Sequence, residues 1–347
     1  MSSTQKTYDS NGGAVWAGIR DLNDRSDPPY DALEEGDRLE GRTVLLTGAS
    51  SGLGLAVAKE CASRGARVLM VCRRDASEEL EAVRRAARLG GRAEGLRADM
   101  ADFASIHALV DDLAARKVRI DVVISNAAVV PGSARTTVDG LEEMLQVNAL
   151  APALLIRRLL EAGLVPNDTH AGNGVGAGSP ATRRPRIVIV ASEAHRSADG
   201  LHLDRLRHVE PYGMAESTAR YGWTKLLLLT YARELGRRLD GGGTGAPDVA
   251  VHALCPGPVA SNIAREVPAI VRPLTRLFFR IFFQSPETAA RPVVYLAASP
   301  RIEGRTGTYQ FLMRRRPPSD LADAPESGRA LWSAFEEILA GSSRRSA

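Results

Sequence analysis

The chain has 347 residues, of which 44% are hydrophobic and 25% charged, and this balance excludes a chain that is disordered throughout. Its 45 basic and 41 acidic side chains leave a net charge of +4 scattered along the sequence, so nucleic acid is not an expected partner. Three cysteines without CxxC spacing predict neither a disulfide framework nor a metal site. No uncharged apolar stretch reaches the roughly 20 residues of a membrane span, and we expect a folded cytoplasmic protein.

The first 40 residues, rich in Asp, Gly, Ser and Pro, predict an N-terminal extension with Trp16 and Tyr30 as candidate anchors. From residue 41 to residue 312, short apolar runs alternate with amphipathic helical stretches, which predicts one Rossmann-type domain. The clearest strands are expected at Thr43–Thr47, Ala66–Cys72, Val122–Ser125, Ile187–Ser192 and Val249–Leu254. Because these runs are wholly apolar, we expect an α/β fold: a doubly wound parallel sheet of about seven strands with helices on both faces.

Three further segments lie between and after these strands. Residues of about 162–185 are rich in Gly, Ser and Pro and predict a flexible surface loop. Residues 263–283 combine helical apolar spacing with three arginines four apart, which predicts an amphipathic helix that either packs on its own domain or contacts an anionic membrane surface. Gly307–Phe311 is expected to be the last, edge strand, followed at 313–347 by a C-terminal helix and a polar tail.

A glycine-rich turn joins the strand Thr43–Thr47 to the next helix and is the expected binding site for a dinucleotide pyrophosphate. Glycine lets backbone N–H groups approach an anion at the positive end of a helix, where a side chain would obstruct it. The same spacing also fits a tight strand-to-helix turn without a ligand. The candidate binding residues are Gly48, Ser50, Ser51, Gly52, Leu53 and Gly54.

The end of the second strand indicates which dinucleotide is preferred. An acidic residue there would accept a hydrogen bond from a free ribose 2′-hydroxyl, but Arg73 and Arg74 stand in its place. A guanidinium matches a 2′-phosphate, so we expect NADP(H) to be preferred over NAD(H). After the third strand, Asp99 beside Met100 is expected either to accept from the adenine amino group or to cap the next helix.

Tyr221 and Lys225 lie four residues apart in a helical run, so both side chains project from one helix face. The ammonium is expected to lower the pKa of the tyrosine hydroxyl and so allow proton exchange near neutral pH. Ser192 ends a strand at the ligand-binding edge of the sheet, where its hydroxyl can donate to a carbonyl oxygen. Pro152 lacks an N–H and frees the carbonyl of Asn148, which either holds a relay water for the lysine or marks a simple kink.

Together these motifs resemble the short-chain dehydrogenase/reductase family. They are TGASSGLG at 47–54, SNAA at 125–128, Asn148, Ser192, YGWTK at 221–225 and PGPVASN at 256–262. The segments VCRR, SEAHR and SPETAARPVVYLA make the chain most similar to the retinol-dehydrogenase-like and protochlorophyllide-reductase-like branch. The chain departs from the family at Ser125 and Ala128, where Asn and Gly are usual, and the Cβ of Ala128 is expected to narrow the approach to the cofactor.

The resemblance implies a role for each catalytic candidate. It makes Tyr221 the general acid/base, Lys225 the group that tunes it and binds the nicotinamide ribose, Ser192 the group that orients the carbonyl, and Asn148 part of a water relay. It also implies that the cofactor is bordered by Asn126, Ala127, Pro256, Gly257 and Val259. Residues of about 262–285 would form a substrate lid.

The expected activity is NADP(H)-dependent hydride transfer between an alcohol and a carbonyl on an apolar small molecule. The alternative is a scaffold or redox sensor that binds NADPH without turnover. The apolar run Leu226–Leu229, behind the catalytic lysine, fits either burial in the core or a homodimer interface.

Overall fold

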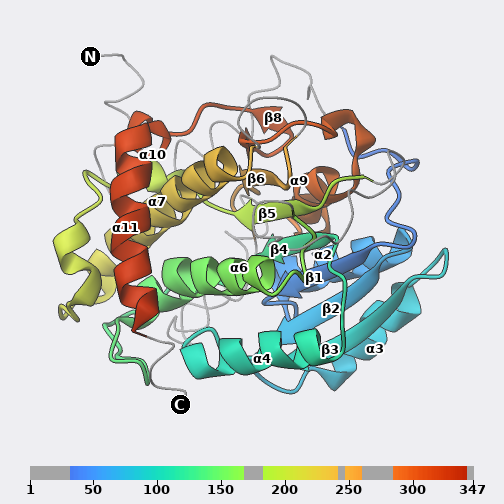
Figure 1. Cartoon of the computed structure of the whole chain (residues 1–347), viewed down its shortest axis with the longest axis horizontal. Helices are drawn as coiled ribbons and strands as arrows, with labels where there is room; N and C mark the ends of the chain where they lie inside the picture. The colour runs from blue at the N-terminus through green and yellow to red at the C-terminus, as the bar shows by residue number, and fades with distance from the viewer. Residues whose placement is uncertain (1–31, 168–182, 241–246, 260–283, 342–347) are drawn as a thin grey trace, which may run out of the picture.

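The computed structural model describes residues 32–167, 183–240, 247–259 and 284–341. Within these ranges, Figure 1 shows one central sheet with helices packed along it. Several predicted features lie outside the described residues: the anchors Trp16 and Tyr30, the middle of the loop 162–185, the amphipathic helix 263–283 and the end of the polar tail. The predictions made for these features, including the lid and the membrane contact, stay predictions.

An eight-stranded sheet in the order β3-β2-β1-β4-β5-β6-β7-β8 forms the centre of the described chain. Every neighbouring pair is parallel except β7 and β8. The strands are β1 (Thr43–Thr47), β2 (Arg67–Cys72), β3 (Arg92–Arg97), β4 (Val122–Ser125), β5 (Arg186–Val190), β6 (Ala250–Cys255), β7 (Thr308–Phe311) and β8 (Arg314–Arg315). The predicted doubly wound parallel sheet is confirmed, with eight strands rather than about seven.

The prediction that Gly307–Phe311 is the last strand was wrong by one strand. Leu312 has φ +57°, and the chain reverses there so that Arg314 pairs antiparallel with Phe311. A two-residue strand of arginines has no apolar period, so its pattern does not indicate a strand. The sheet therefore ends on a short charged strand, which disfavours edge-to-edge pairing with another chain.

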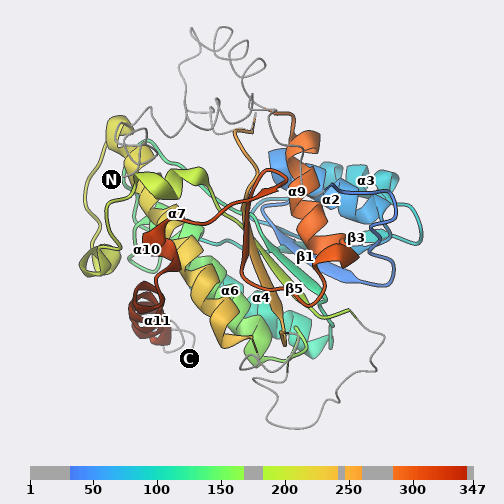
Figure 2. The same cartoon turned by 90° about the horizontal axis from the view of Figure 1, so that it is seen from above.

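Helices cover both faces of the sheet, as the apolar strands require (Figure 2). One face carries α2 (Gly52–Ser63), α3 (Ser77–Ala86) and α9 (Pro286–Ala298). The other carries α4 (Phe103–Ala115), α6 (Ala151–Glu161) and α7 (Met214–Arg238). Shorter helices are α5 (Glu143–Leu145), a π-helix η2 (Gln146–Leu150), the 3-10 helices η3 (Glu193–Ser197), η4 (Leu203–Arg207) and η8 (Pro300–Ile302), and α10 (Asp320–Asp323). The strand order reverses between β1 and β4, which opens the ligand crevice at the carboxyl ends of these two strands.

The described ends of two predicted loops pack on the domain. In the N-terminal extension, Leu33 and Leu39 are buried beside α2 and α9. Asp37 and Arg301 form an ion pair with a 3.5 Å separation, which holds the same segment. Within 162–185, Leu164 is buried and its carbonyl accepts from the N–H of Ile120 at 2.8 Å.

The C-terminal helix α11 (Pro325–Ala340) packs along the outer side of α7 (Figure 1). Tyr231 of α7 stacks on Trp332 of α11 with ring centroids 5.5 Å apart. Leu226–Leu229 are at most 2% exposed within the chain itself, which favours core burial over the dimer interface for this run. Among the described helices, none is both long and apolar enough to cross a membrane.

Candidate active site

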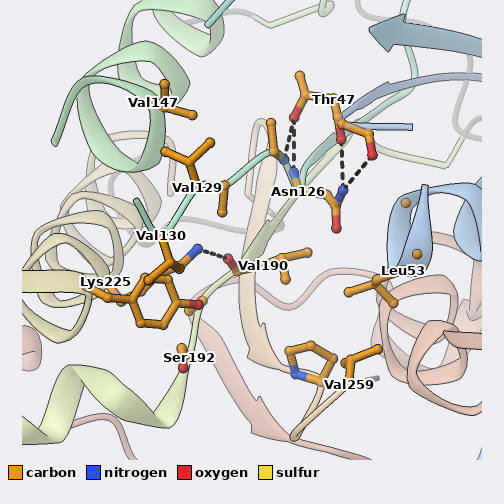
Figure 3. Close-up of a pocket in the computed structure, with 18 of the residues that line it drawn as sticks. Thr47, Leu53, Asn126, Val129, Val130, Val147, Val190, Ser192, Lys225 and Val259 are labelled. Atoms are coloured by element: carbon orange, nitrogen blue, oxygen red, sulfur yellow. Dashed lines mark hydrogen bonds between the residues drawn. The ribbon is translucent and has the colours of Figure 1, made fainter. Parts of the chain in front are cut away.

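A cavity of about 710 Å³ opens at the carboxyl ends of β1, β4, β5 and β6. Across it, Leu53 and Val259 face Val130 and Lys225 (Figure 3). The structure brings all predicted site residues except Asn148 to its wall. These are Gly48, Ser50, Ser51, Gly52, Leu53, Gly54, Arg73, Arg74, Asp99, Met100, Asn126, Ala127, Ser192, Tyr221, Lys225, Pro256, Gly257 and Val259.

The glycine turn has the backbone that a phosphate cradle needs. Gly48 has φ +67° and Gly52 has φ +50°, a region that side chains other than glycine rarely adopt. The N-cap of α2, Ser51, makes no side-chain capping bond, and the first turn of the helix carries no acidic residue. The N–H groups that open α2 are therefore available to an anion in the cavity, and the residues present fit a dinucleotide pyrophosphate.

Two of the glycines serve close packing as well as ligand approach, which extends the reason predicted for them. A Cβ on Gly54 would lie 2.1 Å from the carbonyl oxygen of Gly48. A Cβ on Gly48 would lie 2.9 Å from the Cα of Ala127, in the loop after β4. The turn thus needs glycine for its own close packing, apart from the approach of a cofactor.

The side chain of Asn126 joins the loop after β4 to the end of β1 and the glycine turn. Its Nδ2 donates to the carbonyl oxygens of Thr47 at 3.0 Å and Gly48 at 3.2 Å (Figure 3). The Oγ1 of Thr47 accepts in return from the backbone N–H groups of Asn126 and Ala127 at 3.0 and 3.1 Å. Thr47 was not among the predicted site residues, although a hydroxyl at a strand end followed by glycine is a usable signal.

At the end of β2, the two arginines differ in their partners. Arg74 pairs with Glu79 and donates to the carbonyl oxygen of Ser50 at 3.2 Å, so it braces the glycine turn. Arg73 is exposed on the cavity wall and makes no ion pair or hydrogen bond within the described residues. Its guanidinium is therefore the one of the two that is open to an anionic ligand.

Asp99 lies on the cavity wall beside Met100. Its Oδ1 accepts from the N–H of Ala101 at 2.9 Å, whereas the cap of α4 is Asp102, which accepts from Ala104. The alternative of Asp99 as the helix cap was wrong, because α4 begins at Phe103 and its cap stands three residues after Asp99. Its unused carboxylate oxygen can accept from a ligand in the cavity.

Tyr221 and Lys225 project from one face of α7 into the cavity, as predicted. The Nζ of Lys225 lies 5.7 Å from the centroid of the Tyr221 ring and donates to the carbonyl oxygen of Val190 at 2.9 Å (Figure 3). Burial, with a smaller contribution from Cys255, raises the pKa of Tyr221 to about 12, and the hydrogen bond with Ser192 opposes the rise. The predicted lowering by Lys225 is not found, because desolvation dominates at this site.

Burial also lowers the pKa of Lys225 to about 8, despite an opposing contribution from Cys255. The ammonium is 1% exposed and is held by a single neutral carbonyl within the described residues. A lysine poised in this range can give up and regain a proton near neutral pH. The pair thus combines a protonated phenol with an ammonium of depressed pKa.

Ser192 follows β5 rather than ending it, because the strand stops at Val190. It has extended backbone, and its Oγ accepts from the N–H of Ala194 at 3.2 Å to cap η3. Ser192 also lowers the pKa of Tyr221, against the larger effect of burial. Ser192 and Tyr221 both line the cavity.

Asn148 lies behind the cavity wall and is fully buried in η2. Pro152 follows, and the helix widens to i→i+5 bonding where an N–H is missing. The side chain of Asn148 accepts from the N–H of Val129 at 2.8 Å and donates to its carbonyl at 3.0 Å and to Thr224 at 3.2 Å. The side chain is thus committed to joining the loop after β4 to α7.

After β6, Pro256, Gly257 and Val259 continue the cavity wall. Gly257 has φ +81°, and a Cβ on it would lie 2.6 Å from both Gln284 and Leu312. Val259 forms a parallel bridge with Gln284. Residues 259 and 284 are therefore paired beside the cavity.

Apolar side chains that the sequence did not single out complete the wall. They include Val129, Val130, Pro131, Val147, Val190 and Phe311. No motif marks them, because they come from strand ends, loops and the helix η2, which only the fold brings together. The phenol of Tyr221, the hydroxyl of Ser192 and the ammonium of Lys225 thus line a partly apolar cavity beside the glycine turn. This arrangement suits proton transfer to or from an oxygen of a bound ligand.

Comparison with known proteins agrees with this arrangement. A family model for short chain dehydrogenase matches residues 42–195. Retinol dehydrogenase 14 of Homo sapiens is 32% identical to the chain over 95% of both sequences. A solved structure from Mycobacterium paratuberculosis has a TM-score of 0.62 and 26% identity over 87% of this chain and 95% of that one.

A second solved structure, from Beutenbergia cavernae, contains bound NADP at low occupancy. It is 27% identical, with a TM-score of 0.55 over 80% of this chain and 96% of that one. The chain therefore belongs to the short-chain dehydrogenase/reductase family, in its retinol-dehydrogenase-like branch, and is an NAD(P)-dependent oxidoreductase acting on CH–OH and C=O groups.

Proposed function

We propose that the chain is a cytoplasmic NADP(H)-dependent oxidoreductase that interconverts a carbonyl and an alcohol on an apolar small molecule, with Tyr221 as the general acid/base. The observation that carries the proposal is the convergence of Tyr221, Ser192 and Lys225 on the cavity that the glycine turn also lines. When bound, the nicotinamide supplies or accepts the hydride.

In this proposal, the hydroxyl of Tyr221 exchanges a proton with the substrate oxygen. Its raised pKa keeps it protonated at neutral pH, so that it donates in the direction of reduction. Ser192 donates a hydrogen bond to the same oxygen and fixes its position. Lys225 would hold the nicotinamide ribose and return a proton to Tyr221 through a water on the carbonyl of Asn148, because Pro152, four residues on, has no N–H to offer that carbonyl.

Preference for NADP(H) rests on Arg73. Its guanidinium is exposed at the end of β2, where the adenosine ribose of a dinucleotide lies in this type of fold. The neighbouring Arg74 is paired with Glu79 and is less available. A planar fork of N–H donors matches a 2′-phosphate. Arg73 also occupies the position at which an acidic residue would accept a hydrogen bond from a free 2′-hydroxyl.

Preference for an apolar substrate rests on the wall opposite the glycine turn. Val129, Val130 and Val147 present aliphatic surface there (Figure 3). Burial of that surface favours aliphatic or aromatic ligands and discriminates only weakly among them. The name of the human relative, a retinol dehydrogenase, is compatible with this class of substrate.

The test is the loss of NADPH absorbance with a panel of apolar aldehydes and ketones. Tyr221→Phe should lower kcat by about a hundredfold or more, because the proton donor is lost while the ring stays. Tyr212→Phe makes the same change outside the cavity, where the hydroxyl donates to Glu142, and is the control. A scaffold or redox sensor would instead bind NADPH with no turnover that depends on Tyr221.

A further inference from the structure

A buried polar network connects the catalytic serine to the segment that follows β8. His195 is fully buried in η3, three residues after Ser192. Its Nδ1 lies 2.7 Å from the carbonyl oxygen of Ser192. On the other side of the ring, the backbone N–H of Ser319 donates to Nε2 at 3.1 Å.

These two contacts fix the tautomer of His195. Because Ser319 offers an N–H, Nε2 must be the unprotonated, accepting nitrogen. Nδ1 then carries the hydrogen and donates it to the carbonyl of Ser192. A protonated ring would place a second N–H against that of Ser319, so the geometry requires a neutral imidazole.

The groups around the ring also favour the neutral form. Burial lowers the pKa of His195 to about 4, Arg196 and Arg316 contribute in the same direction, and Glu193 opposes them. The ring of Tyr309 packs edge-on against the imidazole, with centroids 5.5 Å apart. His195 therefore stays uncharged through the range in which an oxidoreductase normally works.

The segment 316–319 is held to η3 at two further points. Arg316 pairs with the carboxylate of Glu193 at 3.2 Å, and Arg196 donates to the carbonyl oxygen of Pro317 at 2.5 Å. The hydroxyl of Tyr309 donates to the other oxygen of Glu193 at 2.6 Å. The position of η3 is thus defined from outside the cavity by residues that follow the last strand.

We propose that His195 is a positioning residue for Ser192. The N–H on Nδ1 holds the main chain of Ser192 so that its hydroxyl points at the substrate oxygen, and the segment 316–319 selects the tautomer that can do so. This inference rests on the proposed role of Ser192. It assigns a function in the reaction to a histidine that touches neither substrate nor cofactor.

Two substitutions test the hydrogen bonds of Nδ1 and Nε2 separately. In His195→Asn the amide nitrogen can take the place of Nδ1 and still donate to Ser192, but the contact with Ser319 is lost. In His195→Gln the amide lies one carbon farther out, so that its oxygen can accept from Ser319 while the side-chain donor to Ser192 is lost and only the backbone N–H of residue 195 still donates there. Each variant loses one hydrogen bond, so similar losses of thermal stability are expected.

The expected result is a split in kcat at similar stability. His195→Asn should keep kcat within about threefold of the wild type, whereas His195→Gln should lower it about tenfold, as expected for one lost hydrogen bond. The affinity for NADPH, measured by fluorescence titration, should change in neither variant. Equal kcat values for the two variants, or kcat falling in step with melting temperature, would overturn the inference.

Ser192→Ala is measured alongside to distinguish the two proposals. If this variant keeps full turnover, the proposed role of Ser192 fails and the inference falls with it. If Ser192→Ala loses turnover while the two His195 variants remain alike, only the inference about His195 fails.

Discussion

His252 offers a test of the energetics of the core. It lies in the middle of β6, is fully buried, and neither ring nitrogen has a hydrogen-bond partner within the described residues. Burial lowers its pKa to about 3, and the charges of Arg186 and Arg315 add to the effect. The native state therefore keeps the ring neutral at pH values where the unfolded chain binds a proton.

The sign and the size follow from this difference. Between the unfolded pKa of about 6.5 and the native value, the unfolded state binds more protons, so stability falls as the pH falls. Near pH 5 the difference is close to one proton, which gives a slope of about 1.3 kcal/mol per pH unit. From about pH 7 to about pH 4 the loss due to His252 amounts to about 3 kcal/mol.

His252→Leu keeps the volume of the side chain nearly constant and removes the titrating group. Guanidinium unfolding of wild type and variant across this pH range should show a free-energy difference that grows as the pH falls, in favour of the variant. His208→Leu, at an exposed position, is the control for the substitution itself. A difference between wild type and His252→Leu that does not change with pH would refute the assignment of a buried neutral imidazole.

Three further predictions concern the cofactor side of the cavity. Arg73→Asp should weaken NADPH binding by about ten- to a hundredfold while leaving NADH nearly unchanged, in fluorescence titrations with Arg85→Asp on α3 as the control. Gly54→Ala should lower NADP(H) affinity at least about tenfold and reduce the melting temperature, because the new Cβ meets the carbonyl of Gly48, whereas Gly36→Ala has open space and should do neither. Thr47→Val should cost about 1–3 kcal/mol for each of the two N–H groups it leaves unpaired, measured by denaturant unfolding against Thr43→Val in the same strand.

The sheet and most of the residues that line the cavity were predictable, because both depend on patterns within short stretches of sequence. Continuous apolar runs identify strands that are covered on both faces, and β1 and β4 have the predicted bounds. The glycine turn and the four-residue spacing of Tyr221 and Lys225 are also local, so the structure brings them together as expected. Parallel topology then places the carboxyl ends of β1 to β7 at the same edge of the sheet.

Features that depend on the surroundings of a residue were not predictable in the same way. The pKa of Tyr221 was expected to fall because Lys225 is near in sequence, but the depth of burial decides its direction. The side chain of Asn148 bonds Val129 and Thr224 behind the cavity wall, contacts that the spacing between Asn148 and Pro152 does not indicate. His195 lies in the segment SEAHR, which indicated only a branch of the family. Its hydrogen-bond partner Ser319 is 124 residues away, so the contact could not be predicted.

The bonds between Thr47, Asn126 and the glycine turn lie wholly within the chain. A dinucleotide arriving at this turn meets a backbone that is already ordered, so little conformational entropy remains to be lost there on binding. Under the proposed function, the glycine turn holds the pyrophosphate of the cofactor, and the wall formed by Val129, Val130 and Val147 faces it across the cavity. Under that proposal, variation among the valines of this wall would change which alcohol or ketone is accepted without disturbing the glycine turn.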